Sequence, residues 1–368
     1  MNYTIEEFKN RLCSVRRKME EGGLEAAVLV KPDDVLYLSG FDAGTGSTSC
    51  ALILAGGEEP VLLVTPAWEE QRVKASTWIG KVHGVSGIAY GLNELHSSLA
   101  KGRVGLDNMN GLACEAADEL AAVYDPWPFV DFGRPMLQVR EVKTPAEIER
   151  IRESAKLCDA LSEVFFDILR PGIWEADIHA ELIYALHKLG GTRMHISMTT
   201  GFPNYWMHYM PYPRKLKNGD LIFCEIAPQY KDQWTEAVRM AVVGKVTREY
   251  RDLFAIELDA TKRLIDALVP GAVSSEIYKG TIELARQSGI AMMETVDTMV
   301  HGAGLTLGDL PNIRYDSADV IREGQSLCVH AIFLFPYIAT EFMLGEHVII
   351  NNKGAELVTK MQTELVAV

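Results

Sequence analysis

The apolar residues of this chain follow two different spacings. In the N-terminal part they form short aliphatic runs broken by polar turns, as in "LEAAVLVKPDDVLYLSGF" (Leu24–Phe41) and "SCALILAGGEEPVLLVTP" (Ser49–Pro66). Such runs predict strands with helices between them, which is an α/β pattern. Further along, the spacing becomes helical, with apolar side chains at Ile148, Ile151, Ala155 and Cys158.

The start of this helical pattern is marked by the residues of "KTPAEIERIRES". Thr144 is a good N-cap, Pro145 suits the first helical position, and Glu147 completes a capping box. We therefore place a domain boundary near residue 140 and predict two domains, 1–140 and 141–368.

The second domain contains an internal repeat. "PGIWEADIHAELIYALHKLGG" and "PGAVSSEIYKGTIELARQSGI" carry proline, glycine, an acidic residue, isoleucine and a second glycine at matching positions. The strands that follow also correspond, and they place Glu225 and His330 at equivalent points. Two copies that each bury one face pack together about a pseudo-twofold axis, so these two residues should face each other across the middle.

Two glutamates lie where a buried strand is expected. In "FCEIAPQYKDQWTEAVRM", a hairpin turning at Tyr230–Lys231 makes Glu225 and Glu236 direct cross-strand neighbours. Two carboxylates that close repel each other unless a proton, a cation or a metal ion lies between them. The alternative is a plain salt bridge to Arg239.

Three histidines are candidates for the same site. His301 is followed by small residues that leave room for a ligand, and His330 is flanked by apolar residues. Each could instead be a core histidine with satisfied hydrogen bonds. His208 lies in the proline-bounded loop "GFPNYWMHYMPYP", whose aromatic residues either pack together or form a box for a cationic ligand. The candidates in that loop for substrate binding are Tyr205, Trp206 and Tyr209.

Composition excludes several classes of function. The formal net charge is −14, which argues against binding nucleic acid or an anionic membrane. The charged N-terminal segment has no apolar core of a signal peptide, and no apolar stretch is long enough for a transmembrane helix. The six cysteines are scattered without a CxxC pair, which favours reduced thiols and a cytoplasmic protein.

The motifs together resemble a known family. "KTPAEIERIRESAKLCD", "GDLIFCEIAPQYKDQWTEAVRMAVVG", "VHGAGLTLGDLP" and "EGQSLCVHAIF" stand in the order found in the pita-bread family of creatinase, prolidase, aminopeptidase P and methionine aminopeptidase. The resemblance covers nearly the whole chain. It implies an α+β pita-bread catalytic domain with a pseudo-twofold repeat, preceded by an α/β, ribonuclease H-like domain of the creatinase type.

The departures from the family concern its metal ligands. Metallopeptidases of the family hold two metal ions with two aspartates, a histidine and two glutamates. By resemblance, the aspartate positions are Glu225 and Glu236, the histidine is His301, and the first glutamate position is His330. The last glutamate position falls on Gly345 without a gap, on Glu346 if the strand slips by one residue, or less readily on Glu341.

These departures change the expected cofactor. His330 cannot bridge two ions as a carboxylate can, and creatinase itself works without metal. We therefore expect no cofactor. The alternative is one zinc, manganese or iron ion held by Glu225, Glu236, His301 and His330.

The resemblance to creatinase leads to a hypothesis for function. We expect a hydrolase that cleaves a C–N bond of a small polar substrate, cationic substrates included. His208 would act as general acid and base with Glu225, Glu236, His301 and His330. Arg239 and Glu346 are added as substrate-binding candidates. The alternatives are an Xaa-Pro aminopeptidase or prolidase, a lyase on the same fold, and an inactive binding homologue.

The resemblance also implies a partner. Two-domain members of the family commonly pair so that one subunit closes the cleft of the other. We expect a homodimer with the glycine- and serine-rich segment Asp42–Ser49 near the partner's site. Apart from this partner we expect only a small-molecule substrate, with no nucleic acid and no membrane.

Overall fold

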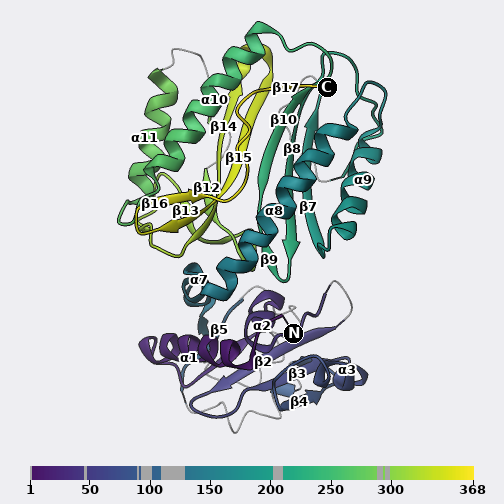
Figure 1. Cartoon of the computed structure of the whole chain (residues 1–368). Helices are drawn as coiled ribbons and strands as arrows, with labels where there is room; N and C mark the ends of the chain where they lie inside the picture. The colour runs from purple at the N-terminus through teal and green to yellow at the C-terminus, as the bar shows by residue number, and fades with distance from the viewer. Residues whose placement is uncertain are drawn as a thin grey trace. The chain divides into compact units, whose positions relative to one another are not determined.

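The computed structural model describes residues 2–44, 48–88, 91–92, 102–108, 129–201, 210–287, 293–294 and 299–368. The chain divides into two compact units, Met1–Arg140 and Glu141–Val368 (Figure 1). None of the helices in these ranges is long and apolar enough to cross a membrane.

The first unit is a mixed six-stranded sheet with helices. The strand order is β4-β3-β2-β1-β5-β6, in which β1 pairs antiparallel to β2 and parallel to β5. The strands are β1 (Ala26–Leu29), β2 (Ser49–Ala55), β3 (Val61–Thr65), β4 (Lys81–Gly84), β5 (Val104–Leu106) and β6 (Phe129–Asp131). The helices are α1 (Ile5–Glu21), α2 (Pro32–Ser39), α3 (Glu70–Lys74) and α7 (Gly133–Glu141), the last of which runs to the boundary between the units.

The second unit is built on one eleven-stranded sheet. Its main path runs β13-β12-β14-β15-β10-β8-β7, and four short strands pair alongside it. The path strands are β7 (Arg193–Thr200), β8 (Leu221–Tyr230), β10 (Ala237–Val242), β12 (Val300–Gly302), β13 (Asp309–Ile313), β14 (Ser326–Phe335) and β15 (Thr340–Asn351). The short ones are β9 (Gln233–Trp234), β11 (Met293–Glu294), β16 (Gly354–Leu357) and β17 (Val366–Ala367).

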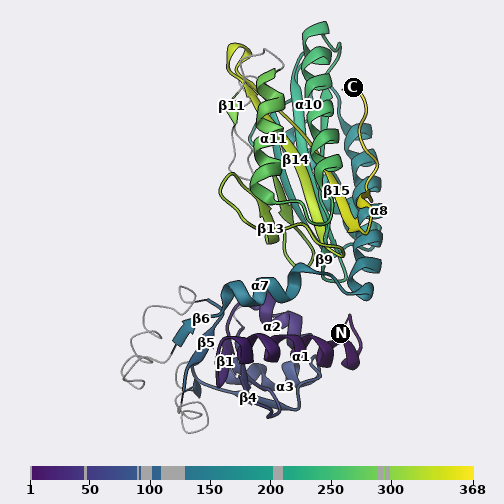
Figure 2. The ribbon, with the colours of Figure 1, turned by 90° about the vertical axis from the view of Figure 1, so that its left-hand side faces the viewer.

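Four helices pack against this sheet, two on each half. α8 (Pro145–Ile168) and α9 (Glu175–Lys188) lie against β8 and β7, whereas α10 (Arg248–Ala267) and α11 (Ser274–Gln287) lie on the half of β14 and β15 (Figures 1 and 2). The predicted capping box of α8 is confirmed: Thr144 accepts a hydrogen bond from the Glu147 amide, and the Glu147 carboxylate accepts one from the Thr144 amide.

The predicted pseudo-twofold repeat is confirmed by the order and pairing of the elements. Two helices followed by strands occur twice, and the two halves meet where β10 pairs antiparallel to β15. Glu225 pairs across β8 and β10 with Val238, Val238 pairs with Gly345, and Gly345 pairs with His330. Glu225 and His330 therefore lie in one row, on either side of the central pair.

The predicted register of the carboxylate hairpin is wrong. Glu225 lies opposite Val238, not opposite Glu236. The two-residue turn falls on Lys231 and Asp232, which both have positive φ (46° and 70°), one position later than expected. Moving the turn by one position shifts the pairing by two residues, so both carboxylates still point to the same face of the sheet.

The packing of α10 buries one carboxyl group completely. Glu257 on α10 accepts a hydrogen bond from the Leu344 amide at 3.2 Å through Oε1, whereas its Oε2 is buried with no partner among the described residues. Burial raises the pKa of Glu257 well above its ordinary value, although the Leu344 amide opposes the shift. In the folded protein, Glu257 therefore stays protonated to a higher pH than an exposed glutamate does.

We predict that Glu257→Gln removes a pH-dependent loss of stability. The pKa of Glu257 is about 4.3 in the unfolded chain and higher in the folded protein. Its contribution to stability is therefore fully present below about pH 4.3 and is lost as the pH rises through the folded pKa. In that window the wild type should lose up to about 1.4 kcal/mol per pH unit relative to the variant. Urea unfolding of both proteins at a series of pH values measures this difference. Glu276→Gln, an exposed position on α11, is the control, and equal pH slopes for wild type and Glu257→Gln would contradict the prediction.

Candidate active site

The candidate site lies on the face of the sheet that points away from the helices. The residues that alternate with Glu225 along β8, such as Cys224 and Ile226, pack into the core beneath α8 and α9. The residues that alternate with His330 along β14, such as Val329 and Ala331, pack into the core beneath α10. The polar row therefore occupies the opposite face, backed by a continuous apolar layer.

Three of the predicted residues come together at one end of this row. His330 Nε2 lies 3.2 Å from Glu236 Oε1 and 3.2 Å from His301 Nε2. His301 Nε2 lies 3.8 Å from the other carboxylate oxygen, Glu236 Oε2. Glu236 and His330 are buried, and His301 is partly exposed.

Glu225 pairs with a histidine that the sequence did not single out. His195 Nε2 on β7 lies 3.0 Å from Glu225 Oε1. Ser197 on the same strand pairs directly with Glu225 and has a buried hydroxyl with no partner among the described residues. The signal in the sequence was the alternation in "RMHISMTT", which places His195 and Ser197 on one face of a strand.

The two carboxyl groups have opposite electrostatic environments. Burial, together with the charge of Glu236, raises the pKa of Glu225, and the hydrogen bond from His195 opposes this only in part. Burial also disfavours ionisation of Glu236. The hydrogen bond and the charge of His330 outweigh it, however, and lower the Glu236 pKa. Glu236 is therefore ionised throughout the physiological range, whereas Glu225 can carry a proton.

The proton of His301 points away from the site. Its Nδ1 lies 3.3 Å from the Gly302 carbonyl oxygen, which can only accept, so the proton of the neutral ring is on Nδ1. Burial lowers the His301 pKa, in spite of the Glu236 charge, which favours this neutral form. The lone pair on Nε2 then faces the ionised Glu236 Oε2 with no hydrogen between them. Both atoms can donate an electron pair to one cation, so the pair fits a bound metal ion.

His347 and Cys328, which the sequence did not single out, lie next to Glu236 on the same face of the sheet. His347 on β15 accepts a hydrogen bond from the Glu236 amide at Nδ1 (3.3 Å), and its Nε2 lies 2.7 Å from Ser326 Oγ. Burial lowers the His347 pKa to about 3, so the ring is neutral and Nε2–H donates to the serine. Cys328 Sγ lies 3.5 Å from His347 Nδ1, on the same face as His330.

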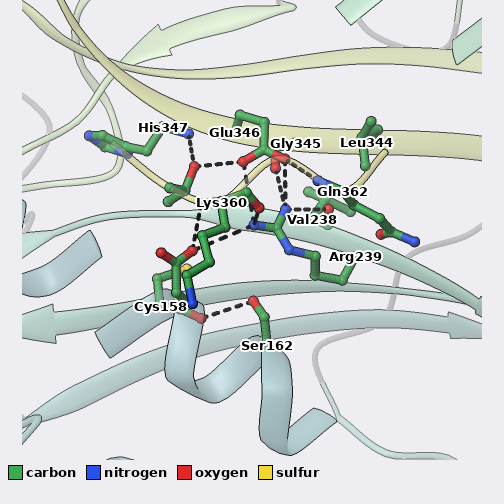
Figure 3. Close-up of polar contacts among 12 residues, drawn as sticks. Cys158, Ser162, Val238, Arg239, Leu344, Gly345, Glu346, His347, Lys360 and Gln362 are labelled. Atoms are coloured by element: carbon green, nitrogen blue, oxygen red, sulfur yellow. Dashed lines mark hydrogen bonds and ion pairs between the residues drawn. The ribbon is translucent and has the colours of Figure 1, made fainter. Parts of the chain in front are cut away.

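The expected substrate contacts of Arg239 and Glu346 are not supported, because both side chains point to the helix face of the sheet. Arg239 Nη1 donates to Glu346 Oε1 at 3.0 Å, and both side chains are almost fully buried. The guanidinium also donates to the carbonyl oxygens of Gly345 (2.9 Å) and Lys360 (2.9 Å), as Figure 3 shows. Thr359 and Gln362 satisfy the remaining capacity of Glu346.

Of the three candidates for the last family ligand position, Gly345 is the one that the strand register puts next to the site. Gly345 pairs with both Val238 and His330 and faces the site, whereas Glu346 faces away. Glu341 pairs with Leu334, farther along the two strands. A Cβ atom at position 345 would lie 2.6 Å from Val238 Cγ2 and 2.9 Å from the Val238 nitrogen, so no side chain fits there.

Several predicted residues lie outside the described ranges. These are His208, Tyr205, Trp206 and Tyr209, so their roles stay predictions from the sequence. The segment Asp42–Ser49 is described only in part, and its place in a homodimer likewise stays a prediction.

Comparison with known proteins establishes the family. Metallopeptidase family M24 matches residues 149–354, and the creatinase/prolidase N-terminal domain matches residues 11–142. This chain belongs to metallopeptidase family M24. The matches confirm the pita-bread catalytic domain and the creatinase-type N-terminal domain that the motifs predicted.

The relatives match this chain over nearly its whole length. The Xaa-Pro dipeptidase of Pyrococcus furiosus is 22% identical over 360 residues, which cover 97% of this chain and 100% of that protein. The structure of an Xaa-Pro dipeptidase from Bacillus anthracis matches with a TM-score of 0.84 at 19% identity, covering 98% of this chain and 100% of that one. Dipeptidase PepE from Mycobacterium ulcerans matches with a TM-score of 0.85 at 21% identity, covering 100% and 99%. These relatives favour the peptidase alternative over creatinase-like hydrolysis.

The family contradicts the expectation that no cofactor is needed. That expectation followed creatinase, whereas the family that matches this chain is one of metallopeptidases. The residues present do not fit a pair of ions, because His330 and Gly345, which the resemblance aligns with the two glutamate positions, offer an imidazole and no side-chain donor atom. They do fit one ion, at the facing atoms of His301 and Glu236.

The position of Arg239 leads to a prediction about stability. Arg239→Met leaves the Glu346 carboxylate buried without its cation, so we expect the free energy of unfolding to fall by about 3–5 kcal/mol. Arg263→Met is the matched control, because Arg263 forms an exposed ion pair with Asp259 and should change stability by less than about 1 kcal/mol. Urea unfolding measures both. Normal stability of Arg239→Met with a raised KM would instead support a contact with substrate.

Proposed function

We propose that this chain is a metal-dependent hydrolase that cleaves the amide C–N bond of small peptides of the Xaa-Pro class. The relatives named Xaa-Pro dipeptidase support the type of bond and the class of substrate. The observation that carries the proposal is the lone pair of His301 Nε2 facing the ionised Glu236 Oε2, because two facing donor atoms can bind one cation between them.

We propose that the site holds a single divalent ion. Glu236 and His301 would bind it, and His330 and Cys328 both lie within reach as a third donor. When bound, such an ion polarises a carbonyl oxygen and lowers the pKa of a bound water molecule. A second ion has no support from β15, where Gly345 packs against Val238.

Glu225 is the residue suited to move the proton of the attacking water. The pKa of Glu225 is raised, whereas Glu236 stays ionised. Two carboxyl groups with such different pKa values are typical of an acid–base residue beside a residue that binds a cation. His195 donates to Oε1 of Glu225, which orients the carboxyl group and leaves Oε2 to accept the proton. The same oxygen then returns the proton to the leaving amide nitrogen, so Glu225 ends the cycle as it began.

In this proposal, His330 orients the carboxylate of Glu236. Its Nε2 carries a hydrogen, because the facing nitrogen of His301 has none to offer, and it donates to Glu236 Oε1. The hydrogen bond and charge of Glu236 raise the His330 pKa, although burial alone would lower it. His330 therefore holds Glu236 Oε1 and leaves Oε2 directed at His301.

A panel of dipeptides tests the proposed function. We expect the metal-reconstituted protein to cleave Ala-Pro and Gly-Pro faster than Ala-Ala, and to leave creatine intact. A chelator should abolish cleavage, and about one equivalent of divalent metal per chain should restore it. In labelled water the heavy oxygen should appear in the released carboxyl group. A dehydrated product without solvent oxygen would indicate a lyase, and binding without turnover would indicate an inactive homologue.

A substitution at Glu225 tests the assignment of the proton. Glu225→Gln keeps an oxygen for the hydrogen bond from His195 but cannot take a proton, so kcat should fall by about 10²–10⁴-fold. Bound metal and KM should stay near the wild-type values, because Glu225 is not placed among the ligands. His187→Ala, at an exposed position on α9, is the control and should leave kcat unchanged. Loss of metal from Glu225→Gln would make Glu225 a ligand and contradict the assignment.

A further inference from the structure

We propose that Cys328 supplies a thiolate ligand, so that the ion is held by Glu236, His301 and Cys328 in a mixed oxygen, nitrogen and sulfur site that prefers zinc. This inference rests on the single-ion site proposed above and names its third donor. The ligand set implied by the family resemblance contains aspartate, glutamate and histidine but no sulfur.

The first support is geometric. One ligand atom from each of Glu236, His301 and Cys328 lies within 4.8 Å of the other two. Ligand atoms around one tetrahedral zinc ion lie about 3.3–3.6 Å apart, given zinc–nitrogen bonds of about 2.0–2.1 Å and zinc–sulfur bonds of about 2.3 Å. Small side-chain rotations are therefore enough for all three atoms to reach one ion.

The sheet register holds the three side chains in this arrangement. Cys328 on β14 pairs directly with His301 on β12 and with His347 on β15. His347 in turn accepts the hydrogen bond from the Glu236 amide. Cys328 thus lies between His301, which is a ligand itself, and His347, which holds the backbone of the other ligand, Glu236.

The two oxygens of Glu236 separate the roles of Cys328 and His330. Oε2 faces His301, whereas Oε1 lies 3.2 Å from His330 Nε2. In metal sites, an imidazole that does not bind the metal commonly donates its N–H to the second oxygen of a ligating carboxylate and so orients that ligand. With His330 in that role, the ion has three protein ligands and keeps an open position, as catalytic zinc sites do.

Metal binding would have to remove the thiol proton. Cys328 is 1% exposed, and burial together with the Glu236 charge raises the pKa of its thiol well above the ordinary value. A divalent cation that forms a bond to sulfur replaces the S–H proton, which is released to solvent. Thiolate favours zinc over manganese or magnesium, which prefer oxygen ligands.

Cobalt(II) reports directly on the sulfur. Metal-free full-length protein loaded with one equivalent of Co²⁺ should show a thiolate-to-cobalt charge-transfer absorption in the near ultraviolet. Cys328→Ser should lose this absorption and weaken zinc binding by more than about 100-fold, beyond the loss typical of outer-shell changes. His330→Gln should keep the absorption. Cys224→Ser is the matched control, because Cys224 is equally buried but faces the helices, and it should also keep the absorption.

The outcomes separate this inference from the proposed function. A wild-type cobalt spectrum without the charge-transfer absorption, or an absorption that persists in Cys328→Ser, overturns the sulfur ligand. If Cys328→Ser does not fold, the wild-type and His330→Gln spectra decide, because His330 as the third ligand would make the His330→Gln site lose cobalt. Sulfur ligation without cleavage of any dipeptide would overturn the proposed function alone, and cleavage without sulfur ligation would overturn this inference alone.

Discussion

The close approach of β10 and β15 at Val238 and Gly345 is the constraint on which the second unit depends. The two halves of the sheet meet at this pair, and there is no space for a Cβ atom at position 345. From the helix side, Arg239 donates to the carbonyl oxygens of both residues and so ties the two strands together. Glu225 and His330 are placed at equal steps from this seam, one in each half.

The same seam determines what chemistry the site can hold. Gly345 has no side chain that could bind a ligand between the two halves. The carboxylates of Glu225 and Glu236 must therefore each be stabilised by a separate partner. His195 contacts Glu225 and His330 contacts Glu236, and the lone pair of His301 beside Glu236 is the proposed position of a cation. Glu225 and Glu236 each form an imidazole–carboxylate pair, and the proposed site has room for one ion.

Much of the fold follows from local signals in the sequence. The capping box at Thr144, the repeated helices and the family motifs each rest on short-range spacing, and each was predicted correctly. The register of the carboxylate hairpin was not, because "YKDQ" offers two adjacent pairs of turn residues and the choice depends on which can adopt positive φ. His195, Cys328 and His347 were missed because their proximity to the carboxylates arises only when distant strands pair. The pairing of Arg239 with Glu346 depends on the face each strand presents, which an alignment by motif does not reveal.

The turn at Lys231 and Asp232 has a consequence for how this protein can change over evolution. Both carboxylates belong to the hairpin that this turn closes, and side chains alternate between the two faces along each strand. Loss or gain of a single residue within the strand segments between them would send one carboxylate to the helix face, away from His195, His301 and His330. A change of two residues would keep both on the open face but slide them past each other. Length variation within these strand segments should therefore be confined to even steps.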